Sequence, residues 1–469
     1  MSDGEKTSFD ACPSEDKSPE YLRACFIATC EALSDHDLQP EHFPEGGRKA
    51  WMVVGGSCLA LVASAGMINA YGTFQDYYET TLLPHTSAST ISFIGSLQTF
   101  FLYFIGPFVG RIFDAHGCRI LIPLGSIVCI LALVLVSFAK PNEAYQVFLS
   151  HGVLFGIGIS ILFNPSIAVL GHWFRRRRAL AIGITTGGSA LGGVLLPIVL
   201  GSLIPKLGFG WAVRVMATIL IVCLITACLT IRTRLPPTKD FSWRTAVDLG
   251  GFRDVRYTLA TLGSFLILIA FFIPYTYIQV YAKFRGVPPH LAKYLISIMN
   301  AMNIPSRILP GILAERYGAL NVYISAAAVC CTLCLGLWLP SQSVASIVAF
   351  TVLYGFFSGP LVSLIPTYVA TISPPEKYGA RLGSVYMVVA VGTLVGTPTA
   401  GALLQVTDEA HFARLIIFCG VLTGAGAAVL GLAAIAGKRQ AQAQASAVRA
   451  QHTAAEPAAW NLNSDELRV

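Results

Sequence analysis

Long apolar stretches separated by short polar connections occupy most of the chain. Each stretch has about 20 residues or more, which is the length that an α-helix needs to cross the hydrocarbon core of a bilayer. The stretches lie at residues 51–73, 88–110, 119–139, 145–170, 179–203, 211–231, 257–282, 291–313, 321–340, 343–370, 381–404 and 412–436. The pattern therefore predicts an all-α polytopic membrane protein with 12 transmembrane helices.

A longer polar segment separates the sixth stretch from the seventh. We expect one six-helix bundle at 49–231 and a second at 257–436, joined by a cytosolic linker at 232–256. Polar tails are expected at 1–48 and 437–469. The first tail lacks the charged start and apolar core of a signal peptide. Its composition, rich in Ser, Glu, Asp and Pro, is typical of disorder.

Two similar sequences support the division into two bundles. Gly110–Arg119 reads "GRIFDAHGCR" and Gly311–Asn321 reads "GILAERYGALN". Both have a Gly, three residues, an acid, two residues and a second Gly. Their offset of roughly 200 residues suits a parallel duplication of a six-helix unit.

The composition agrees with a membrane protein. Hydrophobic residues make up 54% of the chain and charged residues only 12%, about half the charged fraction of a soluble protein. Most of the 12 cysteines lie in apolar stretches, where Cys behaves as a small hydrophobic residue. Cys330, Cys331 and Cys334 have no nearby His or second Cys pair to complete a metal site. We therefore expect neither a metal nor a cofactor.

Lys and Arg are unevenly divided between the two sets of connections. The set on the side of the N-terminus contains Arg111, Arg119, Arg175 to Arg178, the linker arginines, Arg316, Lys377 and Arg381, and the other contains Lys140, Lys206, Arg214, Lys283, Arg285, Lys293 and Arg414. Because cytosolic loops carry the excess of positive charge, both termini are predicted to be cytosolic. The run "FRRRR" is then a topology anchor beside a span rather than a nucleic-acid site.

The connection after the second stretch resembles the major facilitator superfamily signature, Gly-x-x-x-Asp-(Arg/Lys)-x-Gly-x-Arg. Gly110, Asp114, Gly117 and Arg119 match it, and Ala115 replaces the usual basic residue. The resemblance implies the two-bundle major facilitator fold. It also implies that these four residues form a cytosolic latch that holds the halves together as the carrier changes state. The charge missing at Ala115 implies a weaker latch.

Three further stretches resemble the monocarboxylate porter family, and in particular its fungal branch. They are "EGGRKAW" before the first span, "WFRRRRALAIGITTGGSALGG" at the fifth and "GTLVGTPTAGALL" at the eleventh. In the first two, the matching positions are Glu45, Gly46, Gly47, Trp51, Phe174, Arg176, Arg177, Leu180, Ala181, Gly183, Gly188 and Ser189. The resemblance covers nearly all of the region from 45 to 436.

The most unusual residue inside a span is Arg307, which stands among Ile, Leu and Pro in "AMNIPSRILPGILAERYG". It lies about six residues, or roughly 9 Å at helical rise, from the cytosolic end of the eighth span. Spacing alone leaves three interpretations open. The head group snorkels to the interface, it binds a group on another helix, or it faces a water-filled cavity in a functional role.

The family resemblance favours the functional interpretation. Monocarboxylate carriers have an eighth-helix Arg followed four residues later by Gly, as in "RILPG", and in the family this Arg holds the substrate carboxylate. A guanidinium suits the task because it can donate two parallel hydrogen bonds. Asn303 replaces a family Asp one turn earlier, and Asn69 stands where the family has a Lys in the first span. Neither Asn titrates, so the family's proton relay cannot be transferred to this chain.

Other polar side chains inside spans are candidates for the lining of the same site. They are Asn69, Tyr71, Asn164, Tyr275, Tyr354 and Tyr386, with Gln98, Thr185, Tyr277 and Ser358 as further candidates. A hydrogen bond between helices is at least as good an explanation for each of them.

The sequence therefore predicts a secondary active transporter that exports an organic acid or an acidic secondary metabolite by alternating access. Proton-linked uptake of a small monocarboxylate is one alternative, and a non-transporting nutrient sensor is another from a different class. No Walker-type loop or catalytic carboxylate pair interrupts the spans, so we expect neither ATP drive nor an enzyme. The expected partners are a small organic anion or secondary metabolite, protons as coupling ion and the lipid of the plasma membrane.

Overall fold

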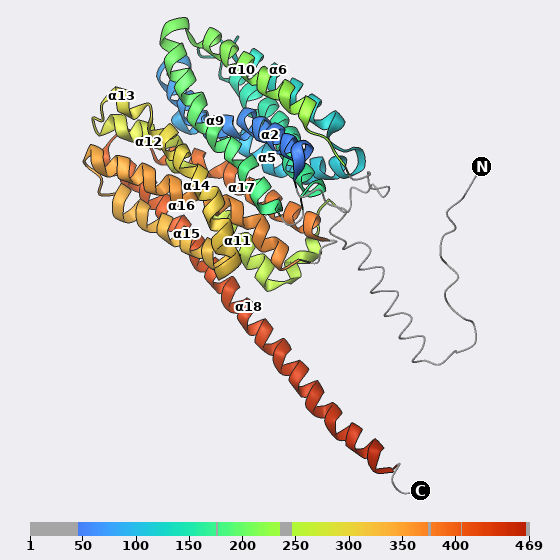
Figure 1. Ribbon diagram of the computed structural model, residues 1–469. Coiled ribbons are helices and arrows are strands. Elements are labelled where there is room, and N and C mark those ends of the chain that lie inside the picture. Colours follow the sequence, from blue (N-terminus) through green and yellow to red (C-terminus); the bar gives the residue numbers. More distant parts are fainter. Residues whose placement is uncertain (1–45, 175–176, 235–245, 374–376, 405, 466–469) are drawn as a thin grey trace, which may run out of the picture.

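The computed structural model describes residues 46–174, 177–234, 246–373, 377–404 and 406–465. In these residues every regular element is a helix. Figure 1 shows two groups of helices side by side, one from the blue-to-green first half of the chain and one from the yellow-to-red second half. The all-α prediction is confirmed. Most of the first predicted tail (1–45) and the middle of the linker (235–245) lie outside the described residues.

The first half of the chain contributes six spans. Span one is broken into α2 (Gly47–Ala63), α3 (Ala65–Asn69) and α4 (Tyr71–Tyr77), and the π-helical turn η2 (Tyr78–Leu82) follows it. Spans two and three are α5 (Ala88–His116) and α6 (Cys118–Val136). Span four is one continuous run of four elements, α7 (Ala144–Val147), η3 (Phe148–Leu154), α8 (Phe155–Ala168) and η4 (Val169–His172). Spans five and six are α9 (Arg178–Leu207) and α10 (Phe209–Thr230).

The second half follows the short helix η6 (Leu249–Arg253) and repeats the arrangement. Its spans are α11 (Val255–Phe271) with α12 (Ile273–Phe284), α14 (Leu295–Tyr317) after the turn α13 (Pro289–Ala292), α15 (Ala319–Leu333) with η7 (Cys334–Trp338), α16 (Val344–Thr371), α17 (Tyr378–Leu403) and α18 (Glu409–Asp465). The helix α18 does not end at residue 436 but continues to Asp465 and projects away from the bundle (Figure 1).

Ten spans are long and apolar enough to cross a membrane by themselves. The other two predicted spans in the described part of the chain fall short for visible reasons. Span one is interrupted at Ser64 and Ala70. The helix α14 carries Asn300, Asn303 and Arg307 within its length. With these two, the structure contains the twelve helical segments that the sequence predicts.

The two repeated sequences have the same backbone geometry. The helix α5 ends at His116 and α14 at Tyr317, and the next span starts two residues later in each case. The residues between them, Gly117 and Gly318, have φ values of 72° and 84°. Positive φ is easily reached only by glycine. Each glycine therefore allows a one-residue turn between two spans. We call the end of the molecule where these turns lie the linker end. The opposite end, where α5 and α14 begin, is called the far end.

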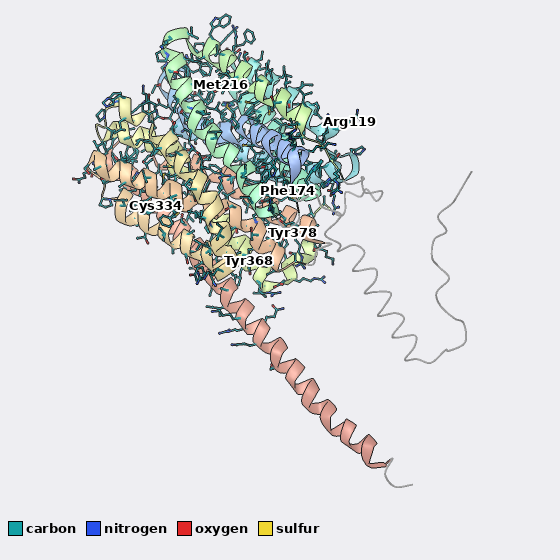
Figure 2. The ribbon with its side chains drawn as sticks, in the orientation of Figure 1. Arg119, Phe174, Met216, Cys334, Tyr368 and Tyr378 are labelled. Carbon is teal, nitrogen blue, oxygen red and sulfur yellow. The ribbon has the colours of Figure 1, made fainter. Side chains whose placement is uncertain are left out.

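The linker end joins several motifs that are distant in sequence. The ring of Trp51 in α2 lies 5.3 Å from that of Phe174, which is labelled in Figure 2. The Trp173 Nε1 donates to the carbonyl of Arg232 at 2.9 Å. On the other half, Arg381 Nε donates to the Asp248 carboxylate at 3.3 Å, which fixes the end of the linker on α17.

Close helix packing depends on glycine at two particular contacts. A Cβ on Gly192 of α9 would lie 2.8 Å from the Cα of Gly66 in α3. A Cβ on Gly396 of α17 would lie 1.9 Å from the carbonyl oxygen of Ile269 in α11. Small residues of this kind let membrane helices approach closely.

Candidate functional site

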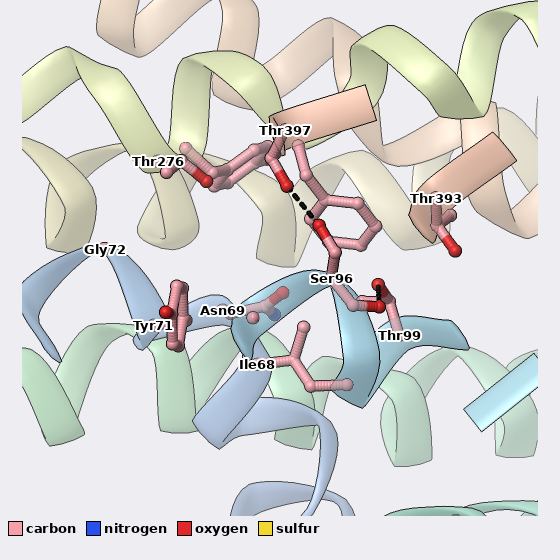
Figure 3. A pocket seen from close by; sticks show the side chains of 12 residues that line it. Ile68, Asn69, Tyr71, Gly72, Ser96, Thr99, Thr276, Thr393 and Thr397 are labelled. Carbon is pink, nitrogen blue, oxygen red and sulfur yellow. Dashed lines mark hydrogen bonds between the residues drawn. The ribbon is translucent and has the colours of Figure 1, made fainter. Parts of the chain in front are cut away.

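A small pocket lies between the two halves (Figure 3). Its lining residues are Ile68, Asn69, Tyr71, Gly72, Gly95, Ser96 and Thr99 from the first half and Phe272, Tyr275, Thr276, Thr393 and Thr397 from the second. The space in which the centre of a water molecule fits is about 20 Å³. That is enough for a water molecule and too little for an organic acid.

The pocket is narrow because hydrogen bonds close it. The hydroxyls of Ser96 in α5 and Thr397 in α17 hydrogen-bond directly across the boundary between the halves (Figure 3). Nearer the far end, Ser89 Oγ donates to the Pro398 carbonyl at 2.7 Å. The structure therefore represents a state in which the halves are closed over the centre.

Arg307 lies on the side of α14 that faces the protein. The exposed side chains Leu309 and Ile312 mark the opposite side of the helix, roughly 140–160° away at 100° per residue. The guanidinium interacts electrostatically with Tyr103 of α5 and Tyr275 of α12, one from each half. It therefore lies at the boundary between the halves rather than against lipid.

No described residue neutralises Arg307. No carboxylate of the described residues forms an ion pair with it, and its buried Nε has no hydrogen-bond partner. A buried charge without a partner is costly, and proteins usually pair it. An anion placed beside Arg307 would supply the missing partner.

A chain of hydrogen bonds orients the residues around Arg307. Ser358 Oγ donates to the Gly355 carbonyl at 3.3 Å, and Tyr275 Oη lies 2.9 Å from Ser358 Oγ. With its proton directed to Ser358, Tyr275 accepts a hydrogen bond from Asn303 Nδ2. Tyr275 also lines the pocket, so it connects the pocket with the arginine.

The predicted residues Asn69 and Tyr71 line the pocket, and both make helix contacts. Asn69 Nδ2 donates to the Ser189 carbonyl at 3.1 Å, and Tyr71 Oη donates to the Ile91 carbonyl at 2.6 Å. The carbonyl of Asn69 in turn accepts from Asn300 Nδ2 at 3.3 Å, which joins α3 to α14 across the boundary.

The other predicted lining residues lie outside the pocket. Asn164 Nδ2 donates to the Ser160 carbonyl within its own span at 3.0 Å. Tyr354 Oη donates to the Phe271 carbonyl at 3.2 Å inside the second half. Tyr386 is nearer the boundary, because its ring centroid lies 5.1 Å from that of Tyr103.

The predicted latch residues lie at the linker end. A Cβ on Gly110 would meet nothing within 4 Å, while one on Gly117 would lie 3.0 Å from Thr233 Oγ1. The carboxylate of Asp114 is 3.8 Å from Arg111 Nη1 on the same helix. The Arg119 side chain is exposed at the same end (Figure 2).

Sequence reasoning did not select Tyr103, Ser96 or Thr397. Ser96 and Thr397 are common residue types in spans, and their pairing depends on how two distant helices pack. Tyr103 did give a weak signal, because it is the single hydroxyl in the aromatic run "FFLYF".

Twelve helical segments in two groups, with a polar site at the boundary between the groups, define a membrane transporter. The chain belongs to the Major Facilitator Superfamily, whose family model matches residues 50–350 and 286–464. Its members are transporters, so the chain is not an enzyme. The superfamily resemblance of the sequence is thus confirmed.

Several fungal relatives match over most of their length. The chain is 39% identical to "MFS-type transporter 1" of Ophiocordyceps sp., over 84% of this chain and 87% of the relative. It is 35% identical to the aspyridones efflux protein of Emericella nidulans, over 82% and 79%. It is 34% identical to the fujikurins efflux protein of Gibberella fujikuroi, over 89% and 88%.

A solved structure shares the fold. The nucleoside transporter NupG matches with a TM-score of 0.63 over 82% of this chain and 99% of its own, at 13% identity. At this identity the match concerns the fold and not the substrate.

Proposed function

We propose that this transporter exports an organic acid or an acidic secondary metabolite by alternating access, with Arg307 as the anion anchor. The observation that carries the proposal is the guanidinium of Arg307, whose buried Nε has no hydrogen-bond partner and which interacts electrostatically with Tyr103 and Tyr275. A carboxylate or enolate there would accept two parallel hydrogen bonds from a permanently charged donor.

Export rather than uptake is supported by two observations. The relatives from Emericella nidulans and Gibberella fujikuroi are named as efflux proteins. In addition, Asn303 and Asn69 stand where monocarboxylate carriers have their titrating pair. The site is therefore suited to holding an anion and lacks the acid and the base of proton-linked uptake at those positions.

We also propose that the chain is a member of the monocarboxylate porter family and that both of its termini lie in the cytosol. Trp51 and Phe174, which come from two of the blocks that resemble that family, are in contact at the linker end. With both termini cytosolic in the plasma membrane, the linker end faces the cytosol and the far end faces the outside. A substrate would then enter beside Arg307 from the linker end and leave when the far end opens.

Deletion of the gene in its native host tests the direction and the substrate class together. We expect one or a few acidic metabolites to accumulate in the cells and to disappear from the medium, as measured by mass spectrometry of both fractions. Complementation with the wild-type gene should restore export. Slow growth on a small monocarboxylate with an unchanged metabolite profile would favour uptake. A deletion that alters only a transcriptional response to a nutrient would favour a sensor.

A further inference from the structure

A buried amide lacks one of its hydrogen bonds at the far end of the first span. Gln75 in α4 is fully buried. Its Nε2 donates to Glu79 Oε1 at 2.7 Å, but its own Oε1 is buried without a partner. Because an unsatisfied buried acceptor is costly, the missing donor requires an explanation.

The charges around Glu79 supply the second observation. Lys283 of α12 pairs with Asp76 of α4, with Nζ 2.5 Å from Oδ1, and so joins the two halves. Glu79, three residues after Asp76, interacts with the same lysine and with Asp76. Among the described residues, the phenols of Tyr71 and Tyr277 also act on Glu79. The Tyr277 hydroxyl interacts with the Gln75 amide as well, but it donates its own proton to the Thr397 carbonyl at 3.3 Å. Two carboxylates thus lie near one ammonium group, which in the described part of the chain forms an ion pair with Asp76 only.

A protonated Glu79 would resolve both problems. A carboxylic acid and a primary amide can form a ring of two hydrogen bonds, because each has one donor and one acceptor facing the other. Gln75 Nε2 already donates to Glu79 Oε1. The acid O–H would donate to Gln75 Oε1 in return, and Asp76 would keep Lys283 for itself.

We propose that Glu79 is a proton-binding site on the far side of this transporter, and that its protonation is needed for the far end to close. The proposal rests on the proposed transport cycle. When the halves separate at the far end, Lys283 moves away with the second half and water hydrates the Glu79 carboxylate. The proton passes from the acid to that water, and a proton must bind again before Gln75, Glu79 and Asp76 can be enclosed.

The position of Glu79 agrees with a proton exchanged near neutral pH. The residue lies in η2, beyond the apolar stretch 51–73 of the first span. Burial raises the pKa of Glu79 to about 7, helped by the charge of Asp76 and opposed by the hydrogen bond from Gln75 and the charge of Lys283.

Infrared titration of the purified full-length protein in lipid nanodiscs tests the proton site without a substrate. We expect a carbonyl band of a protonated carboxyl group that is lost with a midpoint near pH 7. Glu79→Gln should remove the band, whereas Glu143→Gln, in the adjacent far-end loop, should keep it. Asp76→Asn frees Lys283 for an ionised Glu79, so the midpoint should move to lower pH. An unchanged band in the folded Glu79→Gln protein would overturn the proposal, as would an unmoved midpoint in Asp76→Asn.

Export in complemented deletion strains tests the consequence for transport. In media buffered at pH 5 and pH 8, wild-type export should depend on pH, and Glu79→Gln export should lose that dependence because the amide imitates a permanently protonated acid. Equal pH dependence in both strains would refute the inference while leaving the transport function intact. Absence of any wild-type export would refute the proposed function instead, and the infrared titration would still decide the proton site.

Discussion

Helices α5 and α14 are the second spans of their halves, yet their surfaces differ. Both begin at the far end and finish at a glycine with positive φ. The helix α5 is apolar enough to count among the ten membrane spans, whereas α14 is not. On its inward side α14 carries Asn300, Asn303 and Arg307.

The contacts of the two helices differ in the same way. The helix α5 follows α17 along its length, from Ser89 near the far end through Ser96 and Tyr103 to Pro107. The described polar contact of α14 with α9 lies in the half of α14 that is nearer the far end. There Ser297 Oγ donates to the Val194 carbonyl at 3.0 Å. Both helices therefore contact the opposite half, and α14 in addition brings a charge to the boundary.

Removing the charge of Arg307 should have the largest effect on export. We expect Arg307→Ala to lower export of the acidic metabolite about 100-fold, since charge-assisted hydrogen bonds contribute about 1.5–3 kcal/mol. Arg307→Lys should do nearly as much harm, because an ammonium group lacks the planar fork. The measurement is metabolite efflux per amount of transporter in the membrane.

The matched control for that experiment lies on the same helix. Arg316 is an exposed arginine near the linker end of α14, and Arg316→Ala should leave export within about twofold of wild type, as is usual for exposed charges. Full export by both Arg307 variants would show that the guanidinium has no role in binding.

Crowding the contact between α5 and α17 should have the next largest effect. A Cβ on Gly401 would lie 2.7 Å from the Ser89 Cα, so Gly401→Val should hinder closure at the far end. We expect a fall in export of about tenfold, consistent with an overpacking cost of about 1–3 kcal/mol. Gly431→Val is the control, because a Cβ there meets nothing within 4 Å. If both variants export equally, the α5–α17 contact does not limit the cycle.

The sequence was sufficient for the number of helices but not for their ends. Hydrophobicity located span one at 51–73, whereas its helices α2, α3 and α4 extend from Gly47 to Tyr77 and η2 continues to Leu82. The final turns carry Gln75, Asp76 and Glu79, which look like a polar connection when only the sequence is considered. Their burial depends on α12, which lies about 200 residues later in the chain. No local pattern contains that information.

The candidate site was predictable to a similar degree. Arg307 stands out in sequence because a charge inside an apolar stretch is rare. Its neighbour Tyr275 was selected as a polar residue in a span, and so was Tyr354, which is bonded inside the second half. Both tyrosines have the same sequence signal. Which of them reaches the boundary is decided by helix rotation and packing, and single-sequence patterns do not determine these.

The smallest predicted effect concerns the linker-end turn of α5. Asp114 is exposed and lies 3.8 Å from Arg111, and interactions of exposed charges contribute at most about 1 kcal/mol. We expect Asp114→Asn to lower the maximal transport rate about two- to threefold and to leave the apparent affinity unchanged, because the turn is remote from Arg307. Initial rates in membrane vesicles over a range of metabolite concentrations separate the two parameters. Glu143→Gln is the control for loss of a carboxylate elsewhere. An unchanged maximal rate in Asp114→Asn would mean that Asp114 is not part of a latch. A changed apparent affinity in that variant would connect this turn to the binding site.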